Sequence, residues 1–357
     1  MPWITPTLKQ TRSMTRDYVL SQLGARAMIP NSVLRIMSDA KAALAHLAFL
    51  YLDWLAKQLM PDTAEREWLD RHGVIWLTNA DGSKGRKAAT YAHGQLLFNG
   101  NTDVPIPFGS VLTGQNGVNY QTTEEGLIGF DGTGSAPATA LTAGTVGNLP
   151  PGVDLGLTPA IDGITSVETD SDMSSGIDEE TDDQLRERIL FRIQNPPMGG
   201  SQADYVRWAT AVPGVTRAWA APEIGPGTMT VRFLMDDLHP DNYGLPTEQD
   251  IEAVFDYVNT KRPVTVYDCF VMAPILYFYD ITISNLTNDD PTVRARIEAS
   301  IKAMEFKRSK PGQTMYRSWV DEAISQAVGE ETHELTFQTT AMPNPASMPT
   351  LGTVLYG

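Results

Sequence analysis

The chain has 357 residues, of which 42% are apolar and 20% charged. This composition is typical of a globular protein, and the length exceeds what one hydrophobic core organises, so we expect at least two or three domains. The longest apolar tract, residues 42–52, is far shorter than the roughly 20 residues of a membrane span, which argues against an integral membrane protein.

The net charge of −16 is concentrated in one part of the chain. Residues 88–185 contain no Lys or Arg and 14 Asp and Glu. Such a surface repels a phosphate backbone, which argues against nucleic-acid binding. The acidic residues could instead meet a basic partner or keep an abundant protein in solution.

Cys269 is the single cysteine, so no intramolecular disulfide can form, and we expect a buried, inert thiol. The N-terminus is polar and has no compact apolar region after its first basic residue. We therefore expect no signal peptide and synthesis in a reducing cytoplasm.

The first seventy or so residues are predicted to be helical. Apolar residues recur at alternating spacings of four and three, which predicts a helix over residues 32–59, about 40 Å long. Ile36, Ala43 and Leu50 widen this seam, so the helix needs a partner, either residues 14–28 or another subunit. A second helix is predicted over 63–72, ending at Gly73. The candidate partner-interface residues are Val33, Met37, Leu44, Leu47, Tyr51 and Trp54.

Residues 91–167 are rich in Gly, Pro, Thr and Asn and alternate in short runs, which predicts a β-sandwich or barrel-like insert. Asn99-Gly100 and Asp131-Gly132 are candidate hairpin turns. The predicted strands cover residues 95–98, 110–112, 119–122, 138–141 and 164–167.

Residues 175–215 encode two helix starts and two helix stops. Thr181 with Gln184 fits a capping box, and Leu185, Ile189 and Ile193 should form one buried face before Asn195-Pro196-Pro197 ends the helix. Ser201 with Asp204 repeats the capping pattern for a helix that Pro213-Gly214 ends.

The remaining residues alternate strands and helices. We expect strands at 228–235, 264–271, 276–284 and 333–338, and helices at 247–259, 291–306 and 316–328. A helix, an Ala-Val pair and a Gly before a strand occur at 205–215 and again at 319–331, which suggests two related subdomains. The segment 342–345 should be irregular and could be a docking strand. The predicted class is multidomain α+β, divided into residues 1–73, 74–170, 171–273 and 274–357.

No catalytic or metal-binding constellation emerges from the sequence. The histidines (46, 72, 93, 239 and 333) are scattered, and residues 82–87 lack P-loop spacing and are interpreted as a basic surface loop. The acidic run from Asp170 resembles a calcium loop but has Ser175 and Thr181 where Gly and Glu are required. Asp236, Asp237, His239 and Asp241 could bind a cation weakly, but we interpret them as a polar connecting loop. We therefore predict no catalytic residue, metal or cofactor.

The segment 175–215, which contains the two capped helices, also resembles a known protein family. Its acidic lead-in, R-x-R-I-L, P-x-G-G-S-x-x-D-Y and P-G-V motifs resemble the baseplate J-like family of contractile-tailed bacteriophages, in its Mu-type branch. Ile177 departs from the pattern, where a second Gly is expected. The matching positions are Gly176, Asp178, Glu180, Thr181, Asp182, Arg186, Arg188, Gly199, Gly200, Ser201, Asp204, Tyr205, Pro213, Gly214 and Val215.

The resemblance implies a structural baseplate wedge subunit that forms a sixfold collar around the tail hub and links neighbouring wedges. It implies further copies of the chain and other wedge proteins as partners, with the hub and the sheath-initiating wedge protein as additional candidates. The implied location is the virion tail, after synthesis in the host cytoplasm. Two alternatives stay open at this point: a carbohydrate-cleaving enzyme using a carboxylate pair from 170–183, and a carbohydrate-binding adhesin using the Gly/Thr-rich β region.

Overall fold

The computed structural model describes residues 4–24, 27–264 and 266–357 and confirms a multidomain α+β fold with a helical N-terminal part. The chain divides into two compact units, which are considered separately. One unit comprises Met1–Leu77, Lys84–Arg86 and Thr181–Gln194. The other comprises Thr78–Ser83, Lys87–Glu180 and Asn195–Gly357.

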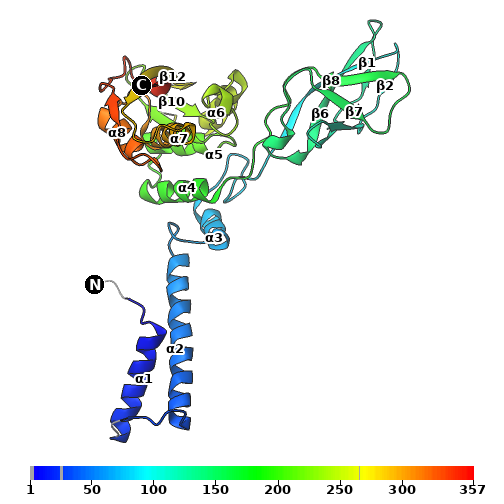
Figure 1. The fold of residues 1–357 in the computed structure, drawn as a ribbon. Helices are drawn as coiled ribbons and strands as arrows, with labels where there is room; N and C mark the ends of the chain where they lie inside the picture. Colours follow the sequence, from blue (N-terminus) through cyan, green and yellow to red (C-terminus); the bar gives the residue numbers. More distant parts are fainter. Residues whose placement is uncertain (1–3, 25–26, 265) are drawn as a thin grey trace. The chain divides into compact units, whose positions relative to one another are not determined.

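The first unit begins with two helices, α1 (Leu8–Leu23) and α2 (Val33–Gln58), which pack side by side (Figure 1). Ser32 caps α2 as its hydroxyl accepts a hydrogen bond from the Arg35 N–H, so the predicted long helix is confirmed. A capping box of Thr7 and Gln10 starts α1. Residues 25 and 26, within the predicted packing segment 14–28, lie outside the described residues.

The same unit contains α3 (Arg66–Trp76) and α4 (Asp182–Gln194), whose facing sides share a small core. The predicted end of the second helix at Gly73 is wrong, because α3 continues to Trp76 and Gly73 is buried within it. A Cβ at Gly73 would lie 3.2 Å from the Cα of Gly85, so this glycine permits a close approach instead of ending the helix. The core consists of Ala64, Leu69, Leu77, Leu185 and Ile189.

The β-rich segment of the second unit forms a closed barrel with the strand order β1-β6-β4-β3-β7-β8. Burial alternates along β6, as expected for a strand with one face in a core. All five predicted strand segments fall within or overlap barrel strands. The barrel strands are β1 (Tyr91–Gly100), β3 (Val111–Gly114), β4 (Asn119–Thr122), β6 (Thr133–Ala143), β7 (Asp154–Leu157) and β8 (Ile164–Thr169), and a separate pair is β2 (Pro105–Ile106) with β5 (Gly126–Leu127).

One predicted turn in this segment is confirmed and the other is wrong. Asp131 and Gly132 lie in the turn before β6, where the Asp131 carboxylate accepts a hydrogen bond from the Thr133 N–H. Asn99 and Gly100 instead end strand β1, which pairs with β6 on one side and with β8 on the other. The Asn-Gly pair is therefore held inside the sheet, where a bulge with β8 occurs between these two residues.

The first α+β part of the second unit has a three-stranded sheet in the order β11-β10-β9. Its central strand β10 (Thr228–Leu234) is parallel to β11 (Asp268–Met272) and antiparallel to β9 (Arg217–Ala221). Helices α5 (Gln202–Ala211) and α6 (Glu248–Lys261) contribute to its core, in which Cys269 is buried as predicted. Strand β11 begins later than the predicted residue 264, and Thr265 lies outside the described residues.

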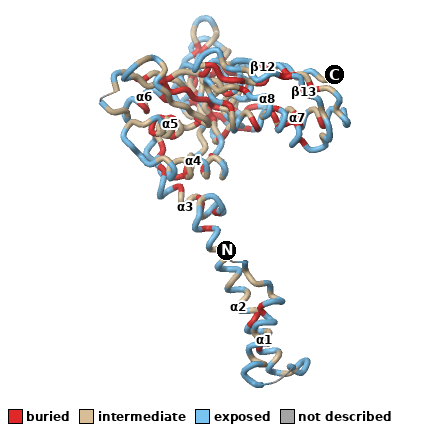
Figure 2. Tube along the Cα trace, turned by 90° about the vertical axis from the view of Figure 1, so that its left-hand side faces the viewer, coloured by how far each residue is buried: buried red, intermediate tan, exposed pale blue. Residues whose placement is uncertain are grey.

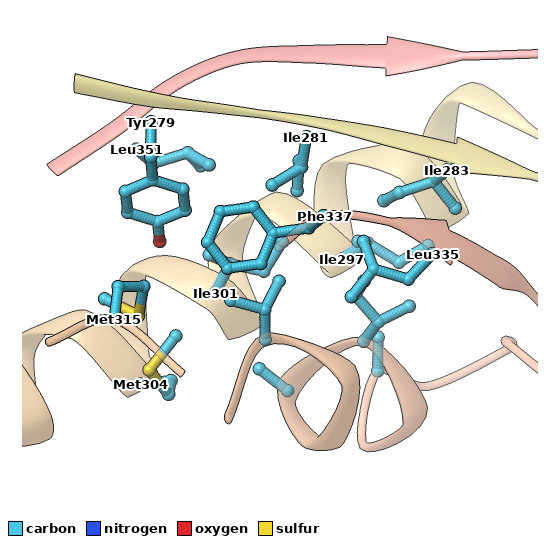
Figure 3. Close-up of a cluster of buried hydrophobic side chains, with 14 of the residues drawn as sticks. Tyr279, Ile281, Ile283, Ile297, Ile301, Met304, Met315, Leu335, Phe337 and Leu351 are labelled. Atoms are coloured by element: carbon cyan, nitrogen blue, oxygen red, sulfur yellow. The ribbon is translucent and has the colours of Figure 1, made fainter. Parts of the chain in front are cut away.

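The second α+β part has the order β13-β12-β14, with α7 (Pro291–Arg308) and α8 (Arg317–Ser325). Its centre, β12 (Ile275–Ser284), is antiparallel to β13 (Glu334–Thr336) and parallel to β14 (Ser347–Tyr356). Figure 3 shows the core, where Ile281 and Ile283 of β12 face Ile297 and Ile301 of α7. The segment 342–345 is irregular, as predicted, and leads into β14.

The two α+β parts share one local arrangement, which agrees with the relation between two subdomains that the repeated sequence pattern suggested. In both, the central strand has one parallel and one antiparallel neighbour. In both, the helix before the antiparallel edge strand begins near a T-shaped aromatic pair, Tyr205 with Trp208 and Tyr316 with Trp319, each with ring centroids 4.9 Å apart.

Candidate functional site

The first feature that stands out is an apolar stripe on α2. Five of the six candidate interface side chains are solvent-exposed, including Leu44 at 68% and Tyr51 at 59%. Figure 2 shows that α1 and α2 contain few buried residues, in contrast to the red cores elsewhere in the chain. The stripe consists of Val33, Met37, Leu44, Leu47, Tyr51 and the partly buried Trp54.

The stripe is exposed because α1 packs on a different face of α2. Ser38 and Ala42 are buried, and Arg16 of α1 forms a two-pronged ion pair with Asp39 at 2.6 Å. The Arg16 hydrogen bond holds the pKa of Asp39 below its ordinary value. At 100° per residue, Ala42 lies roughly opposite Leu44 and Tyr51 around the helix axis. Packing within the chain therefore occurs, but it leaves the stripe in solvent.

Trp54 differs from the rest of the stripe because it already has neighbours in its own unit. Its ring stacks on Tyr51 with centroids 5.7 Å apart and meets the edge of Trp68 at 6.2 Å. Its indole N–H donates to the Glu65 carboxylate at 3.2 Å. Trp54 thus links the end of the stripe to the start of α3.

The second feature is the set of signature residues at the base of the barrel. The Asn148 side chain brackets Gly176, donating to its carbonyl and accepting from its N–H, both at 2.9 Å. A Cβ on Gly176 would lie 2.5 Å from the Gly144 carbonyl oxygen, so only glycine fits there. Asp178 accepts hydrogen bonds from the N–H and hydroxyl of Thr145, both at 2.9 Å.

The two chain segments that enter and leave the barrel are bonded to each other. The Glu180 carboxylate accepts from the Lys87 N–H at 3.0 Å, and the Glu180 N–H donates to the Lys87 carbonyl at 3.1 Å. The Lys87 ammonium donates to the carbonyls of Val212 and Val215, on either side of Pro213-Gly214. Ile177, the residue that departs from the family pattern, has its Cδ1 2.9 Å from where a Gly214 Cβ would be. The isoleucine therefore packs onto the P-G-V turn.

The next signature residues start α4, in the other unit. The predicted capping box is present, with the Gln184 N–H donating to the Thr181 hydroxyl and the Thr181 N–H to the Gln184 side chain. Asp182 accepts from Arg86 at 2.7 Å, and Arg186 donates to the Ala64 carbonyl at 3.2 Å. Leu185 and Ile189 are buried, but Ile193 is exposed, so the predicted third contact of this face is wrong. The core ends one turn earlier because its partner helix α3 is short.

Asp204 organises the start of α5. Its Oδ2 accepts from the N–H groups of Met198, Gly200 and Ser201 at 2.9–3.0 Å, and its Oδ1 accepts from Arg207 at 2.8 Å. Burial raises the pKa of Asp204, but these hydrogen bonds outweigh it and hold the pKa below its ordinary value. A Cβ on Gly200, where φ is +124°, would lie 2.6 Å from Pro263. Gly199 lies in the loop before it, and the Tyr205 ring is fully buried.

Three of the carboxylates considered for catalysis or calcium are engaged in the fold. Asp178, Glu180 and Asp182 bond Thr145, Lys87 and Arg86, as described above. Within the described ranges, no group of three or more His, Cys, Asp or Glu side chains could hold a metal ion. The polar loop after β10 is organised by an ion pair between Asp236 and Arg217 at 2.6 Å. Arg188, the remaining signature residue, lies on α4.

The prediction of a basic surface loop at residues 82–87 is only partly correct. Arg86 has a side chain that is 8% exposed and bridges Asp70 and Asp182, while Lys87 binds carbonyls. Only Lys84 of the three cations matches the expectation of a solvent-facing charge. In the described part of the chain, no helix is long and apolar enough to cross a membrane.

Comparison with known proteins agrees with this combination of barrel, α+β parts and signature residues. Residues 95–176 match the baseplate J-like protein barrel domain, residues 197–273 the baseplate J-like central domain, and residues 279–357 the baseplate J-like protein C-terminal domain. Together these matches cover most of the second unit.

Two relatives span nearly the whole chain. The Mu-like prophage FluMu protein gp47 of Haemophilus influenzae is 33% identical over 87% of this chain and 87% of its own length. The baseplate protein gp47 of Escherichia phage Mu is 31% identical over 95% of both chains. The chain therefore belongs to the baseplate J-like family, in its Mu-type branch, and is a structural protein of the phage baseplate class.

The fold is also similar to a chain in the cryo-EM structure of the anti-feeding prophage baseplate, solved with sixfold symmetrisation. The two share a TM-score of 0.51 at 12% identity, over 97% of this chain and 90% of that one. At this identity the likeness concerns the fold alone.

Proposed function

We propose that this chain is a non-catalytic wedge component of a contractile phage-tail baseplate, which forms a sixfold collar around the tail hub and links neighbouring wedges. The exposed stripe of α2 carries the proposal. Val33, Met37, Leu44, Leu47 and Tyr51 present a continuous apolar face on a 26-residue helix, and such a face is stabilised when another helix covers it.

The partners we propose are further copies of the chain and other wedge proteins, with the tail hub and the sheath-initiating wedge protein as further neighbours. The stripe is the proposed site of helix packing with such a partner. The signature residues are proposed to act structurally, since they hold the base of the barrel and the starts of α4 and α5. We propose virion assembly in the host cytoplasm, without nucleic-acid binding or membrane insertion.

The four-part division into residues 1–73, 74–170, 171–273 and 274–357 remains our proposal for the functional organisation. Under it, the first part joins partners through its helices. The barrel and the two α+β parts then supply surfaces for contacts between wedges.

The experiment replaces Leu44 and Leu47 together with glutamate in the full chain. We expect the variant to fold, because both side chains are exposed, but to lose co-purification with the products of adjacent tail genes. Particles made with it should lack baseplates in electron micrographs. The control is Leu52→Glu, a leucine of similar exposure that lies about 100° around the helix from Tyr51. Normal particles from the stripe variant, or equal losses from both variants, would contradict the assignment.

A further inference from the structure

The turn before β6, where β1 ends, presents a strongly exposed aromatic side chain. Phe130 is 94% exposed and lies in the turn between β5 and β6. Burying a phenylalanine in a partner removes a large apolar area from water, so a rigidly held Phe at a tip is an effective anchor. Isolated exposed apolar residues are common, so the surroundings of Phe130 decide how it is interpreted.

Hydrogen bonds hold the tip in one conformation. The Gly129 N–H donates to the Thr133 carbonyl at 2.8 Å, and the Gly132 N–H donates to the Gly129 carbonyl at 3.0 Å. Two other loops are tied to the same end, through Gly100 N–H to the Gly132 carbonyl and Asn101 N–H to the Gly163 carbonyl. The aromatic ring is therefore presented by a preorganised group of three loops, which lowers the entropy cost of docking.

Each of the three loops contributes an exposed carboxylate: Asp103, Asp131 and Asp162. None of the 98 residues from 88 to 185 is a Lys or Arg that could offset these charges. An apolar anchor with a charged rim is the usual anatomy of a docking surface. Here the rim repels anionic lipid and nucleic acid and favours a basic protein surface.

The chain itself contains such a surface. Residues 1–60 carry seven Lys and Arg against three Asp, a net charge of +4. Those three carboxylates already have partners: Asp17 bonds Ser13, Asp39 bonds Arg16 and Asp53 bonds Thr5. Arg12 and Arg35 lie close enough to Asp39 to act on its charge, which leaves a local positive excess. Exposed Met14 and Tyr18 supply apolar area on α1.

We infer that the Phe130 tip of one copy docks on the α1–α2 helix pair of a second copy, with the three carboxylates facing Arg12 and Arg35. This is a head-to-tail contact, the type of contact that closes copies into a ring. It rests on the proposed function only in requiring several copies in one assembly. It uses a different surface from the α2 stripe.

The first test places the photocrosslinking residue benzoylphenylalanine at position 130 of the full chain. Equal amounts of this chain and isotopically heavy unmodified chain are mixed at low salt and irradiated, and the joined peptides are identified by mass spectrometry. We expect links from position 130 to residues 4–60 of the heavy chain. Links only within one chain, links only to other segments, or no link at all would overturn the inference.

The second test swaps charges. The tip variant is Asp103→Asn with Asp162→Arg, where Asn is chosen because Asp103 has a φ of +61° that Asn tolerates. The helix variant is Arg12→Glu with Arg35→Glu. We expect each variant alone to weaken the contact about tenfold or more, and an equal mixture of the two to restore it. Failure of the mixture to restore it would contradict the inference.

The matched control is Asp154→Arg, an exposed carboxylate on the barrel wall in β7. It should leave the crosslinks at position 130 unchanged, and raising the salt should weaken them in the parent chain. The Leu44 and Leu47 variant separates the two proposals. If this variant loses tail assembly but retains the crosslinks, the two contacts are independent and both proposals hold. If it keeps normal tail assembly while the crosslinks form, the tip contact stands and the stripe proposal fails; if it loses assembly while the parent chain gives no crosslinks, the stripe proposal stands and the tip contact fails.

Discussion

The guanidinium of Arg86 donates to the Asp182 carboxylate at 2.7 Å, across 96 residues of sequence. Lys87 follows Arg86 in the sequence, and Glu180 lies two residues before Asp182. Lys87 and Glu180 belong to the other unit and form hydrogen bonds with each other. The segment between them, which includes the whole barrel, thus begins and ends at adjacent points. The barrel is an insertion with two neighbouring connections.

Replacing Arg86 should destabilise the unit that contains α3 and α4. Arg86→Gln removes bonds to Asp70 and Asp182, and both carboxylates are about two-fifths exposed, so we expect a loss of about 2 kcal/mol. The hydrogen-exchange rates of the α3 and α4 amides should rise as the stability of this unit falls. The control Lys84→Gln removes the same charge from an exposed side chain and should leave exchange unchanged.

Replacing Asp204 should loosen the start of α5. Asp204→Asn weakens the acceptor for three backbone N–H groups and removes the partner of Arg207, for an expected loss of about 2–3 kcal/mol. Because the folded pKa is lowered, this stability is present above the unfolded value near ~3.9 and is lost as the pH falls through the folded pKa.

Thermal unfolding of the Asp204 variant at pH 7 and in acid measures both effects. The difference between parent and variant should shrink in acid. Asp183→Asn is the control, since Asp183 also lies in a first helical turn but its side chain is 93% exposed. An equal shift from both variants would show that helix-dipole effects, not the buried network, dominate.

Alanine at position 176 should disturb the base of the barrel. Its Cβ would lie 2.5 Å from the Gly144 carbonyl oxygen and 2.6 Å from the Asn148 side chain, so backbone must move. We expect a cost of about 2 kcal/mol, measured by denaturant unfolding with tryptophan fluorescence. Gly156→Ala, whose Cβ would lie 3.7 Å from the Thr113 carbonyl oxygen, should be close to neutral.

Glu305 should make the second α+β part less stable at alkaline pH. Burial raises the pKa of Glu305 to about 7, although Tyr279, the Leu351 backbone, Arg217 and Lys302 oppose the shift. Because the folded pKa is raised, the stabilising contribution is full below the unfolded value near ~4.3 and is lost as the pH rises through 7.

The Glu305→Gln variant checks this directly. It should be more stable than the parent at pH 8.5, by at most about 4 kcal/mol, and similar to it near pH 5. Glu298→Gln, on the same helix, is the control. A parent chain whose melting temperature does not fall between pH 5 and 8.5 relative to the variant would contradict the prediction.

Local signals in the sequence predicted most of the helices and the barrel strands. Ser32, Thr181, Ser201 and Thr247 start their helices as expected, because capping depends on side chains within three residues. The short strands β2, β5 and β7 were not predicted, because strands of two to four residues carry little periodicity. The ten-residue β14 was also not predicted; its distant partner β12 determines its pairing.

The errors at Gly73, at Asn99-Gly100 and in the loop 82–87 share one cause. Each residue resembles a helix end, a turn or a surface charge when only its neighbours in sequence are considered. Gly85, strand β8 and Asp182 supply the deciding contacts, and all come from other segments of the chain. A local sequence pattern does not specify which residues from distant segments will contact a given residue.

The sequence by itself determined the fold class, the family and the positions of the helix caps, because these depend on composition, periodicity and short motifs. Only the tertiary structure decided that α1 covers Ala42 and leaves Leu44 and Tyr51 exposed, and that Phe130 lies at a tip with three carboxylates. Burial depends on which surfaces meet in three dimensions. An apolar periodicity predicts that a face will be covered, but the packing of the whole chain decides whether its own residues cover it.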